Sequence, residues 1–161
     1  MELAGFAKKW CHPEHPPEPV ELASLNAVEL EFGITLPKDY REQVLAVGLP
    51  GPTLALLSGI VDREVDLQDL SELHSPAQIA DATHAWRAAG MPKHLLAIGT
   101  DSAGSLFCFD TRDLCDSTVH AAPIYFWDHE FGTTDRLATS FPDWIASYLQ
   151  DWSDGLSYDD F

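Results

Sequence analysis

The chain has few basic residues: 9 of its 161 residues are lysine or arginine, against 26 aspartates and glutamates, a formal net charge of −17. A surface of this sign repels nucleic acid and anionic membranes, so we expect neither as a partner. It attracts cationic proteins. The charge leaves two interpretations open, because an acidic composition is also typical of high solubility or of a salt-rich or high-GC source. The sharper interpretation is a surface that captures a basic protein, for example a nuclease.

Long hydrophobic runs and paired cysteines are also missing. No segment approaches the roughly 18 to 20 apolar residues of a membrane span. At the N-terminus, Lys8 and Lys9 follow a short apolar patch, whereas a secretory signal begins with its basic residues. The three cysteines, Cys11, Cys108 and Cys115, are an odd number, which favours free thiols. We therefore expect a cytoplasmic protein, with a chain long enough for one domain with its own core.

Proline and glycine divide the chain into elements of expected structure. We expect helices at 3–10, 21–32, 37–47, 75–89 and 140–149, and strands at 54–61, 65–70, 95–98, 105–109, 123–127 and 136–139. Most of the strands come in neighbouring pairs, which favours the α+β class: a single domain with helices packed against an antiparallel sheet. The expected division is an N-terminal extension with a proline-rich connector over 1–19, a main domain over 20–150, and a frayed acidic tail over 151–161.

Local signals support several of these boundaries. Ser75-Pro76-Ala77-Gln78 and Ser140-Phe141-Pro142-Asp143 both have the pattern of a capping box at a helix start. Gly104 and Gly132 fall between paired strands, and Gly104 suits the positive φ of a hairpin loop. On the helix expected at 21–32, Leu22 is predicted to lie on the buried face with Leu25 and Val28.

Two groups of residues have possible chemistry. Asp128-His129-Glu130 follows a predicted strand and is either a general acid–base cluster or a polar loop. Cys11-His12-x-x-His15 offers three metal ligands without a nearby fourth, and the alternative is a solvated linker. Cys108, in an apolar strand, is expected in the core, although a catalytic thiol with a distant histidine stays an alternative. No phosphate loop or nucleophile elbow is present, so we expect no catalytic residue, cofactor or metal.

Three stretches carry a resemblance to a known family. Glu29–Tyr40 reads as a helix, a glycine stop, a short apolar bridge and a helix opened by proline; Leu95–Asp110 reads as an apolar hairpin with an Asp and Gly turn; and Pro123–His129 precedes Ala138–Ile145. In this order they resemble the SMI1/KNR4 family, or SUKH superfamily, over roughly residues 22–149. The loop after the second helix and the insertion at 62–91 depart from the family pattern.

The resemblance implies function as well as fold. The family is implicated as immunity proteins that neutralise bacterial toxins by binding, with fungal relatives in cell-wall regulation, and it is not an enzyme family. We therefore expect a non-enzymatic partner of a basic toxin domain. The alternatives are a regulatory scaffold without a toxin partner, and a small hydrolase or metal-dependent enzyme that uses the His129 region. The expected partner contacts are acidic residues in predicted loops with one histidine and one tryptophan: Asp110, Asp113, Asp116, Asp128, His129, Glu130, Asp151, Trp152 and Asp154.

Overall fold

A single antiparallel sheet forms the centre of the computed structural model, which describes residues 1–161. The five strands lie in chain order: β1 (Glu72–Leu73), β2 (Leu95–Thr100), β3 (Leu106–Asp110), β4 (Ile124–Trp127) and β5 (Thr134–Ala138). Each strand pairs with the next one, so β1 and β5 are the edges. The hairpins expected around Gly104 and Gly132 are confirmed, and both glycines have positive φ, at 93° and 68°.

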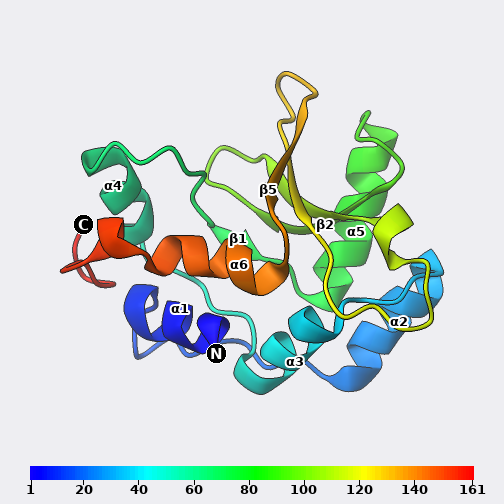
Figure 1. The fold of residues 1–161 in the computed structure, drawn as a ribbon, viewed down its shortest axis with the longest axis horizontal. Coiled ribbons are helices and arrows are strands. Elements are labelled where there is room, and N and C mark those ends of the chain that lie inside the picture. The colour runs from blue at the N-terminus through cyan, green and yellow to red at the C-terminus, as the bar shows by residue number, and fades with distance from the viewer.

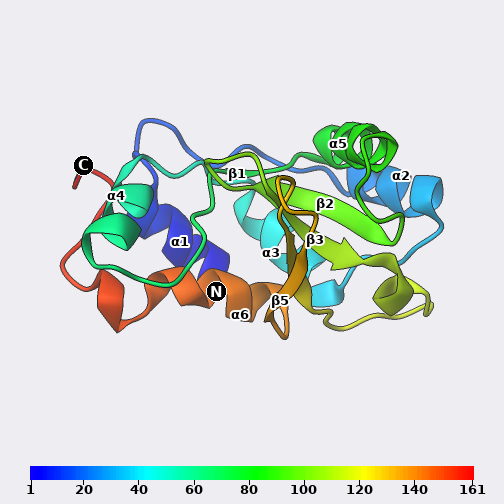
Figure 2. The ribbon, with the colours of Figure 1, turned by 90° about the horizontal axis from the view of Figure 1, so that it is seen from above.

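Six helices surround the sheet (Figures 1 and 2): α1 (Glu2–Trp10), α2 (Leu22–Phe32), α3 (Lys38–Val47), α4 (Ala55–Asp62), α5 (Pro76–Ala88) and α6 (Phe141–Ala146). Short 3₁₀ turns occur at η1 (Thr111–Leu114), η2 (Ser147–Leu149) and η3 (Asp151–Ser153). Alternate residues of β2 and β3 point to opposite faces, and both faces are buried. Leu95 and Cys108 pack toward α5, whereas Leu96 and Phe109 join the larger core that includes α1, α3 and α6. The expected α+β class is confirmed.

The capping box predicted at Ser75 is confirmed, whereas only half of the one predicted at Ser140 is present. Ser75 and Gln78 form a reciprocal capping box at the start of α5, and the Ser140 side chain accepts a hydrogen bond from the Asp143 amide at the start of α6. None of the helices has the length and apolar content needed to cross a bilayer.

The strand predicted at 54–61 is wrong, because these residues form helix α4. Its buried residues, Ala55, Leu56, Gly59 and Ile60, follow the three- and four-residue spacing of a helix face. A short apolar run has no periodicity clear enough to separate a strand from a buried helix. The strand predicted at 65–70 is also wrong, since β1 begins later. Leu22 is exposed instead of buried.

Helix α1 and the first residues of the C-terminal segment pack into the main core. Trp10 of α1 is fully buried, donates its indole N–H to the Tyr148 carbonyl oxygen at 2.9 Å, and stacks on Trp152 with ring centroids 6.0 Å apart. Trp152 is only partly exposed, and Ser153 is buried. The expectation of a frayed C-terminal tail is therefore wrong, because stacking and backbone hydrogen bonds hold its first residues in place.

Candidate functional site

The predicted contact residues lie in three separate regions. Figure 1 shows η1 at the right, the tip of the β4–β5 hairpin at the top and the C-terminal segment at the left, and Figure 2 keeps them apart. The first region holds Asp110, Asp113 and Asp116; the second holds Asp128, His129 and Glu130; the third holds Asp151, Trp152 and Asp154. The fold does not bring them together into one patch.

In the first region, Asp110 supports the chain around it. Its buried carboxylate accepts hydrogen bonds from the Arg112 side chain, at 2.7 Å from Nη2 and 3.1 Å from Nε, and from the Arg112 amide at 2.9 Å. Burial acts to raise the pKa of Asp110, but the hydrogen bonds and charge of Arg112 outweigh it and lower the pKa. Asp113 and Asp116 are exposed, and burial together with the Asp110 charge raises the pKa of Asp113.

In the second region, the hairpin tip is held by its own hydrogen bonds. Asp128 Oδ1 accepts from the amides of Glu130 (2.9 Å) and Phe131 (3.2 Å), and His129 Nδ1 lies 2.9 Å from Ser105 Oγ. The Asp128, His129 and Glu130 side chains line none of the five cavities, and the structure therefore offers no pocket in which they could act as general acid and base. Phe131, which the sequence analysis missed, is 78% exposed beside these acids.

In the third region, the C-terminal segment lies against α4. Arg63 Nη1 donates to the carbonyl oxygens of Trp152 (2.5 Å) and Asp154 (2.8 Å), and the Thr53 hydroxyl donates to the Tyr158 carbonyl oxygen. Trp152 also donates its indole N–H to the Ser147 carbonyl oxygen at 2.9 Å. Trp152 therefore supports this region structurally, whereas the Asp151 and Asp154 side chains are exposed.

The outer side of α4 carries exposed apolar side chains, in a segment predicted to be a strand. Leu54, which caps the helix, is 64% exposed, and Val61 is 63% exposed. They are seven residues apart and share one side of the helix, opposite the buried residues. No local signal in 54–61 could have located this face, because a short apolar run fits a helix and a strand equally well. We name it the α4 surface, which comprises Leu54 and Val61 with the exposed acids that follow them at the end of the helix, Asp62, Glu64 and Asp66.

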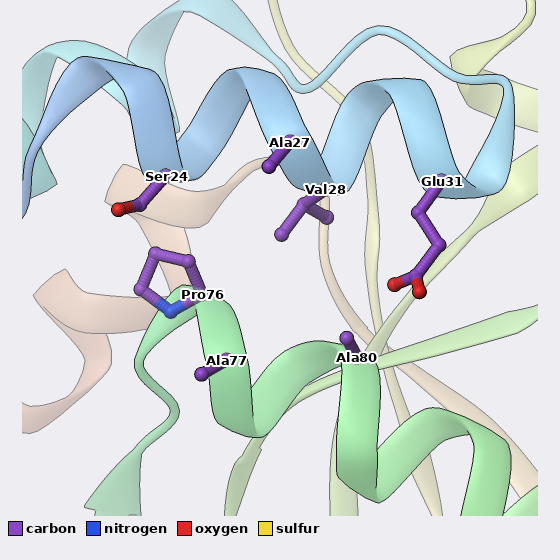
Figure 3. Close-up of a pocket in the computed structure, with 7 residues that line it drawn as sticks. All are labelled: Ser24, Ala27, Val28, Glu31, Pro76, Ala77 and Ala80. Atoms are coloured by element: carbon purple, nitrogen blue, oxygen red, sulfur yellow. The ribbon is translucent and has the colours of Figure 1, made fainter.

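The cavity shown in Figure 3 lies between α2 and α5 and has a volume of about 300 Å³. Small side chains leave this space: Ala27 of α2 faces Ala77 and Ala80 of α5, with Pro76 at one end. Glu31 is the one charged residue in the lining. Ser24 also lines the cavity, but Figure 3 shows its hydroxyl at the opposite end from the Glu31 carboxylate, so the two are not placed as a nucleophile with its base.

The N-terminal Cys-His-x-x-His segment follows the end of α1. No three His, Cys, Asp or Glu side chains are grouped so that they could hold a metal ion. Burial raises the pKa of the Cys11 thiol to about 12, which opposes the thiolate form that metals bind. His12 Nδ1 instead accepts a hydrogen bond from the Glu14 amide at 3.1 Å.

Comparison with known proteins assigns the fold to a family. No curated protein matches the chain. The model of the SMI1/KNR4 family (SUKH-1) matches residues 19–147, which include all five strands and every helix except α1. This match covers most of the chain and follows the antiparallel sheet and flanking helices described above, so the protein belongs to the SMI1/KNR4 family (SUKH-1).

Proposed function

We propose that this protein is a non-enzymatic binding protein that captures a cationic protein in a stoichiometric complex, as an immunity protein does with its toxin. The observation that carries this proposal is the lack of neutralisation on the acidic surface. At most four of the 26 acids take part in an ion pair within 4 Å, namely Glu29, Glu31, Glu42 and Asp110. Most of the remaining acids are exposed, and their carboxylates are available to a partner of opposite charge.

The mechanism is occlusion of the partner's active site. The acidic field raises the rate of encounter with a basic domain, and apolar contacts formed afterwards slow dissociation. A nuclease domain fits this requirement, because it must be basic to hold its own nucleic-acid substrate. Among the expected contacts, the exposed acids Asp113, Asp116, Glu130, Asp151 and Asp154 are free to meet such a partner.

The test is capture from a lysate of the protein's own source, with elution by salt and identification by mass. We expect one dominant basic protein at equal stoichiometry, whose activity falls to zero when one equivalent of this chain is added. Its association rate should fall about tenfold or more between about 50 and 500 mM NaCl, because salt screens the steering field. Several weak partners without an inhibited activity would instead indicate a regulatory scaffold and would overturn the proposal.

A further inference from the structure

We propose that the α4 surface is the docking site for the cationic partner, and that the element docking there is a basic amphipathic helix. This inference rests on the proposed function for the existence of a cationic partner. It adds which face binds and what chemistry the bound element has.

Helix α4 is apolar on both of its sides, although only one of them is covered. Gly59 and Ile60 face the core, whereas Leu54 and Val61 face solvent with Leu57 partly buried beside them. A helix that is hydrophobic all round is normally buried on every side. The uncovered side of α4 therefore provides apolar anchors that gain free energy when a partner covers them.

The charge around these anchors selects the partner. Residues 54–66 contain three acids, Asp62, Glu64 and Asp66, and a single cation, Arg63, whose side chain donates to the carbonyl oxygens of Trp152 and Asp154. A second copy of this chain would bring the same acids to the interface, and like charges would repel it. A partner helix with leucine-type side chains along one face could cover Leu54 and Val61, and lysine or arginine beside that face could pair with the neighbouring acids.

The surface is organised before a partner arrives. A Cβ atom at Gly59 would lie 2.7 Å from Leu156 Cδ1 and 3.7 Å from the Trp152 ring, which shows how closely the C-terminal segment supports the helix. Trp152 is in turn stacked on the buried Trp10. Because these contacts already hold α4 in place, binding costs little additional ordering.

The test uses a defined probe: a fluorescently labelled leucine–lysine amphipathic peptide of about 18 residues, long enough to form a helix, with a scrambled peptide of equal composition. Anisotropy in about 50 mM NaCl gives the dissociation constant. We expect L54S/V61S to weaken binding of the amphipathic peptide about tenfold or more, because the apolar anchors are lost. The scrambled peptide should bind more weakly and respond little to this substitution.

The matched control is L22S/L30S, which removes two leucines of α2 that are 50% and 86% exposed and far from α4 along the chain. Its binding should equal that of the wild type. D62N/E64Q/D66N should weaken binding at low salt and have little effect at high salt, because screening already removes that attraction. No peptide binding, an unchanged affinity in L54S/V61S, or an equal loss in L22S/L30S would overturn the proposal. If F131A loses affinity for the peptide and L54S/V61S does not, the contact lies at the β4–β5 hairpin, and the proposal is also overturned.

Capture from the lysate with two baits, the wild-type protein and L54S/V61S, separates this inference from the proposed function. If wild type and L54S/V61S retain the same basic protein equally, the docking site is wrong and the proposed function stands. If wild type retains it and L54S/V61S does not, both are supported. If neither retains a basic protein, the proposed function fails, and the peptide titration still decides whether the α4 surface binds a cationic amphipathic helix.

Discussion

His74 is a titratable side chain held in an almost fully buried position, with 6% of its surface exposed. Its Nδ1 lies 3.1 Å from the Ala97 carbonyl oxygen. Burial lowers the pKa of His74, and the Ala97 hydrogen bond and the Glu72 charge oppose that shift without cancelling it. The folded protein therefore resists protonation at this site more than the unfolded chain does.

This difference makes stability depend on pH in a predictable direction. Below the ordinary histidine value of 6.5, the unfolded chain gains a proton that folded His74 does not accept, so the unfolded state is favoured. The His74 contribution is complete above this pH and is lost as the pH falls toward the lowered folded pKa. We expect urea unfolding between about pH 7.5 and 5.5 to show a smaller decline for H74N than for wild type. H15N, at an exposed position, should follow the wild type; parallel curves for H74N would contradict the prediction.

The three thiols differ in accessibility. Cys108 is enclosed in β3 and Cys11 lies at the end of α1, and burial raises the pKa of both thiols. Cys115 is exposed, and its Sγ donates to the Thr111 carbonyl oxygen at 3.3 Å.

Because the thiolate is the reactive form, we expect a thiol reagent to modify one cysteine per native molecule rapidly, and C115S to remove that fast phase. Unfolding in denaturant should expose the other two. A fast phase that survives in C115S would show that Cys11 or Cys108 is reached in the native state.

The proline-rich connector is joined to the main domain by a short backbone bridge. Glu18 and Leu49 exchange two hydrogen bonds, of 3.1 and 2.8 Å. Gly48 makes this approach possible, because its φ is 94° and a Cβ atom there would lie 2.5 Å from the Glu18 carbonyl oxygen. The connector is thereby tied to the end of α3.

Replacing Gly48 by alanine should break this bridge. The combined cost of the unfavourable φ and the clash with backbone is about 2–4 kcal/mol in the free energy of unfolding. G51A is the matched control, since a Cβ atom at Gly51 has no neighbour within 4 Å and its φ is not in the left-handed region. Denaturant unfolding checks both variants, and equal stability of G48A and G51A would show that the connector contributes nothing.

The net charge of −17 affects the molecule as a whole. Unpaired carboxylates repel each other across the surface, which destabilises the compact state. Helix α1 lies before residue 19, where the family match begins, but it still belongs to the same folded unit, because Leu3, Phe6 and Trp10 are buried in the main core.

Added salt should weaken the repulsion between the surface carboxylates by screening their charges. We expect the thermal midpoint to rise between about 20 and 500 mM NaCl, because the Debye length falls well below the spacing of surface charges. D62N/E64Q/D66N should show a smaller rise than the wild type. A midpoint that falls with salt would mean that attractive ion pairs outweigh the repulsion.

Local patterns were sufficient for much of the fold. The Ser75–Gln78 capping box, the Gly104 and Gly132 turns and the paired strands depend on hydrogen bonds between near neighbours, and these predictions are confirmed. The residues at 54–61 were misassigned because a short apolar run satisfies both helix and strand, and its packing partners, Trp10 and Leu156, are distant in sequence.

The candidate site shows the same division between local and long-range information. From the amino-acid sequence came the family, the acidic charge and the chemistry of the expected partner, since these depend on composition and on ordered short motifs. Tertiary packing decided that Asp110 and Trp152 support the structure, that the acids divide into three regions, and that Leu54 and Val61 face solvent. Side-chain exposure follows from contacts between segments far apart in the chain, and no local pattern contains them.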